Sequence, residues 1–124
     1  MATVATNNIP LQVTVTATST AIARGTRVTL NSSGLVAASA IGIRGDYITL
    51  QDIAASGIGL AAPIAAGGSV TVLAGEASCD RGDVAYSMAA GLVGVTTTSA
   101  VIMGRWLQTT ANGALGVIQL SSVS

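Results

Sequence analysis

Residues 81–92 read Arg-Gly-Asp-Val-Ala-Tyr-Ser-Met-Ala-Ala-Gly-Leu, a pattern that predicts a turn, a short strand, a second turn and another strand. A degenerate copy lies at residues 24–35, which read Arg-Gly-Thr-Arg-Val-Thr-Leu-Asn-Ser-Ser-Gly-Leu. Both copies begin with Arg-Gly, and both have Gly-Leu-Val ten residues after the arginine. The sequence therefore predicts an all-β domain with an internal duplication.

Two offsets between the copies suggest where the duplication begins and ends. The Arg-Gly turns are 57 positions apart (81 − 24), whereas Gly59 aligns with Gly104 at an offset of 45 (104 − 59). The difference predicts an insertion of about 12 residues (57 − 45) in the first copy, between Ser39 and Ser56. We expect an N-terminal arm and first strand at residues 1–20, then a single β domain at 21–124, with repeat one at 23–73 and repeat two at 81–120.

Alternation of apolar and polar residues locates the expected strands. Residues 11–20 alternate strictly, with Leu11, Val13 and Val15 on one face and threonines on the other. Further strands are expected at residues 26–30, 35–38, 47–50, 70–73, 84–87, 92–97, 101–107 and 115–120. The Ala-rich run from Ile64 allows a short helical turn, because Pro63 and the following glycines oppose a longer helix.

The composition excludes most catalytic chemistry. Only 8% of the residues are charged, and neither Lys nor His occurs. Without His or Lys, the chain has no Ser-His-Asp triad, no Cys-His pair and no Schiff-base lysine. Cys79 is the single cysteine, so an intrachain disulfide and a cysteine-based metal cluster are excluded as well. We therefore expect no enzyme, no cofactor and no metal site.

Charge and hydropathy also restrict the expected partners. The net charge is zero and the five arginines are scattered, so nucleic-acid binding lacks its electrostatic basis. Two long uncharged windows are rich in Ala, Gly, Ser and Thr and are interrupted by glycines, which indicates short strands rather than a membrane span. A surface with so few charges favours a protein that is largely covered in use.

Two further features have competing interpretations. The tripeptide Arg-Gly-Asp occurs at residues 44–46 and 81–83, where it matches a cell-adhesion motif but is also explained by the turn that precedes a strand. Arg105 and Trp106 combine the residue types that are enriched at interface anchors. Trp106 is equally suited to fill a core made of small aliphatic side chains. Arg105 and Trp106 are therefore candidate anchors of a subunit interface.

Residues 80–120 resemble the small capsid decoration, or cement, proteins of tailed bacteriophages. The resemblance rests on Asp-Arg-Gly-Asp-Val-Ala-Tyr, Gly-Leu-Val, Met-Gly-Arg-Trp-Leu and Gly-Val-Ile-Gln-Leu, in that order. It extends loosely over residues 23–73, where Thr26 replaces the Asp83 of the second copy. Trp106 is unusual for this family. The resemblance implies a small β-barrel or β-tulip-like domain that forms homotrimers.

The same resemblance implies a structural virion protein that is made in the host cytoplasm and placed on the outer capsid surface. Its expected partners are the major capsid protein and further copies of itself, and its expected role is to bridge neighbouring capsid subunits and stabilise the expanded head. Strand addition by the N-terminal arm makes Ile9, Leu11, Val13 and Val15 candidate contacts to the capsid or to a neighbour. The alternative is a β-rich binding module of a phage fibre or surface protein that recognises carbohydrate.

Overall fold

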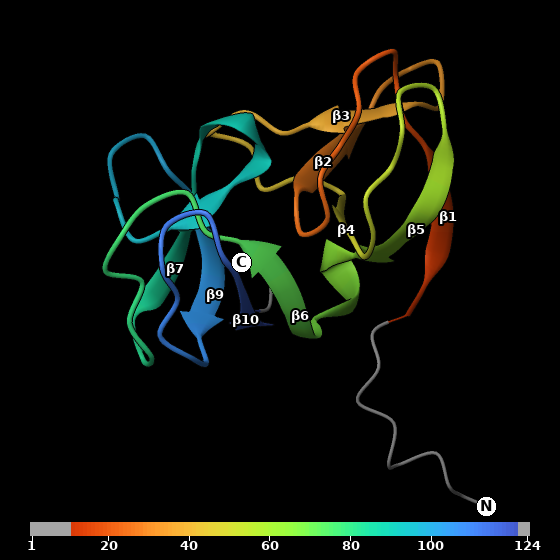
Figure 1. Ribbon diagram of the computed structural model, residues 1–124. Coiled ribbons are helices and arrows are strands. Elements are labelled where there is room, and N and C mark those ends of the chain that lie inside the picture. Colours follow the sequence, from red (N-terminus) through yellow and green to blue (C-terminus); the bar gives the residue numbers. More distant parts are fainter. Residues whose placement is uncertain (1–10, 122–124) are drawn as a thin grey trace, which may run out of the picture.

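The computed structural model describes residues 11–121, and within this range ten strands form two antiparallel five-stranded sheets (Figure 1). The first sheet has the order β1-β5-β4-β2-β3 and the second β6-β10-β9-β7-β8. The first sheet consists of β1 (Val13–Thr16), β2 (Arg27–Leu30), β3 (Val36–Ala38), β4 (Tyr47–Thr49) and β5 (Ile58–Pro63). The second consists of β6 (Gly68–Leu73), β7 (Val84–Ser87), β8 (Val93–Gly94), β9 (Ile102–Trp106) and β10 (Leu115–Leu120).

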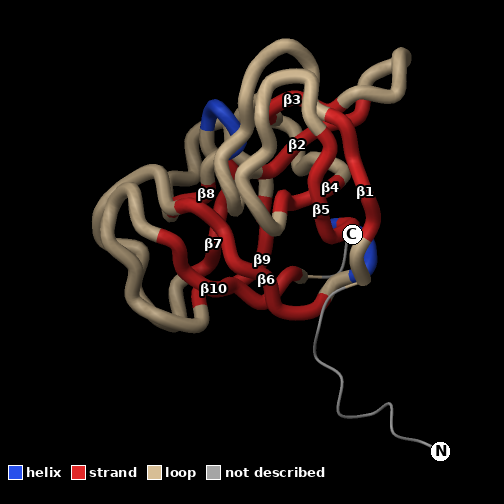
Figure 2. Tube along the Cα trace, turned by 45° about the vertical axis from the view of Figure 1, so that its right-hand side comes forward, coloured by secondary structure: helices blue, strands red, loops and turns tan. Residues whose placement is uncertain are grey.

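Helical structure in the described range is limited to short 3₁₀ turns, which appear as small blue segments among red strands in Figure 2. One of them, η2 (Ile64–Ala66), confirms the expected turn after Pro63. The other, η3 (Ala89–Gly91), lies between β7 and β8. No helix between residues 11 and 121 has the length and hydropathy needed to cross a membrane.

The two sheets repeat one design at a constant spacing. Val13 pairs with Ala61 in the first sheet and Val70 pairs with Ile118 in the second, so both partners are displaced by 57 positions (70 − 13, 118 − 61). The pairings β2–β3 and β4–β5 recur in β7–β8 and β9–β10 at the same spacing. We therefore define unit 1 as residues 13–64 and unit 2 as residues 70–121.

The constant spacing corrects the predicted repeat boundaries. An insertion of about 12 residues between Ser39 and Ser56 would displace β4 and β5 relative to β9 and β10, and no such displacement occurs. Repeat one was also expected to end at residue 73, but β6 belongs to the second sheet. The error came from aligning Gly59 with Gly104, whereas Gly59 corresponds in the structure to Gly116. A side chain at Gly59 would collide with Ile53, and one at Gly116 with Thr110, the residue at the matching position.

The expected all-β class is confirmed, but barrel closure is not. In each sheet the two edge strands meet only through an isolated parallel bridge, Ala17 with Val36 in unit 1 and Ala74 with Val93 in unit 2. These single bridges leave each sheet open rather than closed by a full ladder. The expected strands at 84–87 and 115–120 agree with β7 and β10, while β8 is much shorter than the expected 92–97.

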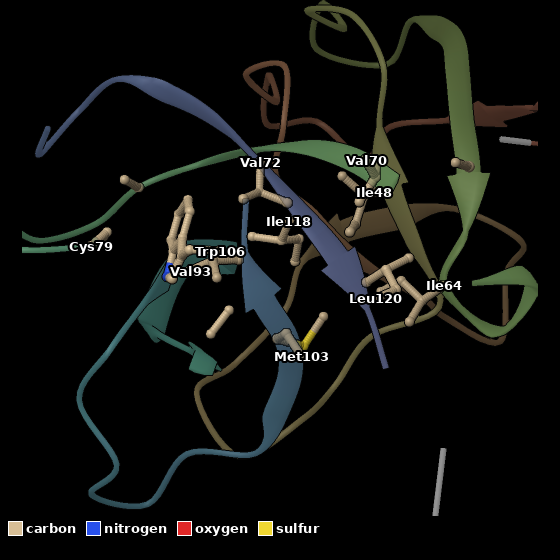
Figure 3. Close-up of a cluster of buried hydrophobic side chains, with 13 residues drawn as sticks. Ile48, Ile64, Val70, Val72, Cys79, Val93, Met103, Trp106, Ile118 and Leu120 are labelled. Carbon is tan, nitrogen blue, oxygen red and sulfur yellow. The ribbon is translucent and has the colours of Figure 1, made fainter. Parts of the chain in front are cut away.

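Each unit has its own buried apolar cluster, and the larger cluster also spans the junction. Val15, Val28 and Val36 belong to the smaller cluster, which lies within unit 1. Their counterparts Val72, Ala85 and Val93 belong to the larger cluster (Figure 3). This larger cluster also includes unit 1 side chains, namely Ile48, Ala62 and Ile64. The two units are therefore joined by a continuous apolar core rather than by a linker alone.

Candidate interaction surfaces

The candidate N-terminal contacts lie in quite different environments. Ile9 is outside the described residues, as is the predicted arm at residues 1–10. Leu11 is 63% exposed and remains available to a partner. Val13 is half-buried and Val15 is buried in the core of unit 1, because β1 already pairs with β5 of its own chain. The prediction that Val15 contacts the capsid or a neighbour is therefore wrong.

The neighbouring residues Arg105 and Trp106 point to opposite faces of β9. Trp106 is 0% exposed, and its indole Nε1 donates a hydrogen bond of 3.2 Å to the backbone oxygen of Gly94. Figure 3 shows it inside the cluster beside Val93. The interface-anchor prediction is therefore wrong for Trp106, and the alternative core role is the observed one. Arg105 is exposed, and its Nη1 donates to the backbone oxygen of Gly82 at 2.6 Å.

Arg27 is a buried cation at the junction of the two units. Its guanidinium is 0% exposed and lies within hydrogen-bond distance of five backbone oxygens, in two loops at residues 40–44 and 88–92. Nη1 donates to the backbone oxygen of Ile43 in unit 1 at 2.5 Å, and Nη2 donates to the backbone oxygen of Met88 in unit 2 at 2.5 Å. Burial lowers the pKa of Arg27 to about 10, which still leaves it charged at neutral pH.

Other polar side chains reinforce the same junction. Arg44 reaches across from unit 1, with Nη1 donating to the Ile102 oxygen at 3.0 Å and Nη2 to the Ser121 oxygen at 2.6 Å. Ser87 is buried in unit 2 and donates its hydroxyl to the backbone oxygen of Ile41 in unit 1. The first Arg-Gly-Asp tripeptide thus supplies a structural contact through its arginine. Sequence inspection missed this role because the partners are backbone oxygens far along the chain.

The Glu76 carboxylate holds the loop after β8. It accepts hydrogen bonds from the backbone N–H groups of Val95 at 2.7 Å and Thr96 at 2.9 Å, and from the Thr96 hydroxyl at 2.7 Å. Burial alone would raise the pKa of Glu76, but these hydrogen bonds outweigh burial and lower the pKa below 4.5.

Because the folded-state pKa of Glu76 is lowered, its ionised form stabilises the fold at neutral pH and this contribution is lost as pH falls through the folded-state pKa. We expect Glu76→Gln to lower the free energy of unfolding by about 1 kcal/mol at pH 7, with the deficit shrinking toward pH 3. Thermal unfolding of both proteins across this pH range measures the effect. A deficit that does not change with pH would contradict this role of the carboxylate.

An apolar groove lies on unit 2, beside the place where Arg44 of unit 1 contacts Ile102 and Ser121. It has a volume of about 410 Å³ and is lined mainly by Val84, Ile102, Arg105, Leu107, Gln119 and Leu120. Ile102 is 51% exposed and Leu107 is 41% exposed, so large apolar side chains reach the surface at this groove. This combination is typical of a surface that is covered by a partner.

Unit 1 also exposes large apolar side chains. Ile58 and Leu60 alternate along β5 on the face away from the core, and Ile58 has the highest exposure among the large apolar residues described, at 72%. They lie opposite threonines of the edge strand β1. Leu30, at the end of β2, is also exposed. Both units therefore present apolar surface, in agreement with the shortage of charged residues.

The described residues offer no arrangement for metal binding or for thiol chemistry. Between residues 11 and 121, no group of three or more carboxylate or cysteine side chains could hold a metal ion. Cys79 is buried, and burial together with the charges of Glu76, Asp80 and Asp83 raises the pKa of its thiol. Cys79 therefore remains a protonated core residue at neutral pH.

Comparison with known proteins finds a likeness in fold. No family model matches the chain, and no curated protein matches its sequence. Among solved structures, the N base of head fiber gp8.5 in bacteriophage phi29 superposes with a TM-score of 0.70 and 16% sequence identity. The match covers 92% of this chain and 99% of the other. At this identity the likeness establishes a shared fold over almost the whole of both chains.

Proposed function

We propose that this chain is a structural protein of a phage virion that binds the outside of the head. It assembles as a homotrimer, contacts the major capsid protein, bridges neighbouring capsid subunits and stabilises the expanded head. Such a role needs shape and several modest contacts rather than reactive groups, because contacts made at several subunits at once add up to durable attachment.

The observation that carries the proposal is the near-complete fold match to a protein of the phage head. That protein is a head fiber base, and the match covers 92% of this chain. The surface of the chain supports the same conclusion, because exposed apolar side chains on both units are suited to protein–protein contact. The buried Arg27 donates hydrogen bonds that join the two units, so its guanidinium is used within the fold and is not exposed to a ligand.

The alternative, a module that binds carbohydrate, has less support. Sugar-binding surfaces generally use exposed aromatic side chains, and this chain contains only one Trp, two Tyr and no Phe. Trp106 is fully buried, while Tyr47 and Tyr86 are half-buried. None of the three provides an open aromatic platform.

Binding to purified heads tests the proposed function. Heads that lack the protein are mixed with it before and after expansion and are then sedimented. We expect the protein to sediment with expanded heads in a saturable amount per head, and those heads to resist heat better than untreated ones. Heads with no bound protein under saturating conditions would contradict the proposal. Binding without a gain in heat resistance would instead indicate an attachment role, as for the base of an appendage.

Removing residues 1–10 tests the predicted role of the N-terminal arm. If the arm, including Ile9, adds a strand to the capsid protein or to a neighbour, the truncated protein should occupy far fewer sites on expanded heads. Quantitative sedimentation at several protein concentrations measures the occupancy. Thermal unfolding is the control, since β1 begins at Val13 and the fold should remain intact. Unchanged occupancy would contradict the role of the arm.

A further inference from the structure

Within one chain, unit 2 covers a specific face of unit 1. The covered face is formed by β4, β5 and η2, and its side chains belong to the larger buried cluster. Unit 1 contributes Ile48, Ala62 and Ile64 to this junction. Unit 2 contributes, among others, Met103 and Leu120, whose matching positions in unit 1 do not belong to the smaller cluster. Because the two units share strand order and register, each of these faces has an equivalent elsewhere on the same molecule.

The equivalent of the covered face is the groove on unit 2. Adding 57 to Ile48, Ala62 and Ile64 gives Arg105, Gln119 and Ser121, all of which line the groove. Ile48 and Ala62 are buried, whereas Arg105 and Gln119 are exposed. Leu107 in the groove corresponds to Leu50, which packs against the larger cluster. The groove is therefore the uncovered copy of a surface that is an interface on unit 1.

The complementary surface also has an uncovered copy, on unit 1. Subtracting 57 from Met103 and Leu120 gives Asp46 and Pro63. Asp46 is exposed and Pro63 is half-buried. Leu115 is 41% exposed and lies partly against Gly25 of unit 1, where an added Cβ would be 2.9 Å from Leu115 Cδ2. The counterpart of Leu115 is Ile58, which is 72% exposed. The counterpart of the buried Ser87 is Leu30, which is 44% exposed.

The residues that differ between the buried faces and their free copies are complementary in charge. Ile48 and Met103, which belong to the same buried cluster, correspond to Arg105 and Asp46 on the free faces. Two apolar members of the cluster thus correspond to a cation on one free face and to an anion on the other, and the carboxylate of that anion also accepts a hydrogen bond from the backbone N–H of Leu30 at 2.8 Å. Polar residues at these positions keep the free faces soluble before assembly, and opposite charges favour their association.

From these correspondences we infer that the groove on unit 2 receives unit 1 of a second copy of this chain, in the way that unit 1 receives unit 2 within the chain. The contact is heterologous, since it joins two different faces, and it repeats from copy to copy until a ring closes. This inference deepens the proposed function by naming the surfaces that join the homotrimer, but it does not depend on the capsid.

Blocking each face separately tests the inference. Leu107→Glu places a charge in the groove, and Ile58→Glu places one on the complementary face of unit 1. Both residues are exposed in the single chain, so folding should be preserved, which circular dichroism checks. We expect light scattering to show the wild-type protein as an oligomer and each variant alone as a 12.1 kDa monomer. Ala77→Glu is the control, because Ala77 is exposed and belongs to neither face, and it should assemble like the wild type.

Mixing the two blocked variants gives the decisive result. Each variant retains one intact face, so a heterologous contact predicts a one-to-one heterodimer that grows no further. A mixture that remains monomeric, or single variants that assemble like the wild type, would overturn the inference. A monomeric wild-type protein would also overturn it, together with the proposed homotrimer, and if that monomer still bound heads, the head-binding part of the proposed function would stand. An oligomer that behaves as expected but does not bind heads would contradict the proposed function alone.

A charge exchange provides a second, independent measurement. Arg105→Glu and Asp46→Lys should each weaken assembly at low salt, and the double variant should recover it at least in part. Because Asp46→Lys also removes the acceptor of the Leu30 N–H group, thermal unfolding checks that each variant remains folded. Single variants and a double variant that assemble equally well would contradict the pairing of the two free faces. Loss of head binding by Arg105→Glu without any change in oligomeric state would show that the groove holds the capsid protein, which would also overturn the inference.

Discussion

Replacing Arg27 with Met is expected to lower the free energy of unfolding by about 3–5 kcal/mol. The substitution keeps much of the side-chain volume but removes the guanidinium, which lies within hydrogen-bond distance of five backbone oxygens in two loops. Removing the charge relieves the cost of its burial. It also leaves several buried oxygens without a donor, and this second effect should dominate. Urea unfolding at neutral pH, followed by the fluorescence of Trp106, measures the change.

Arg24→Met is the matched control for this prediction. Arg24 precedes the same strand but is exposed, and it is the backbone N–H group of Arg24 that donates a hydrogen bond to the Asp52 carboxylate. Its substitution should change the free energy of unfolding by less than about 0.5 kcal/mol. If Arg27→Met were as stable as the control, the relieved cost of burying the charge would offset the lost hydrogen bonds, and Arg27 would not be the main connection between the units.

Gly91→Ala is expected to destabilise the protein by about 3–4 kcal/mol. Gly91 has φ of 75°, and an added Cβ would lie 2.4 Å from Thr26 Cγ2 and 2.5 Å from the backbone oxygen of Arg27. These neighbours belong to unit 1, so the new methyl group would force the units apart at their junction. Thermal and urea unfolding of the variant measure the loss.

The repeat supplies an internal control for the glycine prediction. Gly34 occupies the matching position in unit 1 and has a similar φ of 82°, but no atom lies within 4 Å of an added Cβ. Gly34→Ala should therefore cost only the backbone strain, about 1 kcal/mol. The difference between the two variants isolates the steric effect of the junction. Equal losses would show that the junction can adjust to the extra methyl group.

Local structure was largely predictable from short sequence patterns. Strict alternation and β-branched residues identified the strand at Val13–Thr16, and apolar runs between turn residues identified Val84–Ser87 and Leu115–Leu120. These signals are local because a strand needs one apolar face and its turns need particular backbone angles. Most strands therefore followed from the sequence, but β5 (Ile58–Pro63) was not among the expected strands, and the length of β8 depended on pairing that local patterns do not encode.

The repeat register was less predictable because glycine is abundant in this chain. Fifteen glycines allow several alignments of the sequence with itself, and one of these produced the false insertion. A better signal was present in the strands, since Val-Thr-Val occurs at residues 13–15 and again at residues 70–72. These two segments have the spacing of 57 found in the structure (70 − 13). The first segment lies within residues 1–20, in the expected arm and first strand, and therefore outside the expected repeat one.

The candidate site was only partly predictable, because burial depends on contacts between distant residues. Trp106 and Arg105 are adjacent in the sequence, yet one is buried and the other exposed, as alternation along β9 requires. Arg27 is buried among backbone oxygens up to 65 positions away in the chain. Nothing in the local sequence distinguishes it from the exposed Arg24. Side chains that join the two units become visible only when both sheets are in place.

The most direct test of the proposed function is a cryo-electron microscopy reconstruction of expanded heads incubated with an excess of this protein. We expect added density on the outer surface of the shell, into which the two-sheet chain fits and which touches more than one major capsid subunit. Heads incubated without the protein should lack this density. A reconstruction with no added density on the outer surface, at protein concentrations far above those of the head sites, would contradict the account.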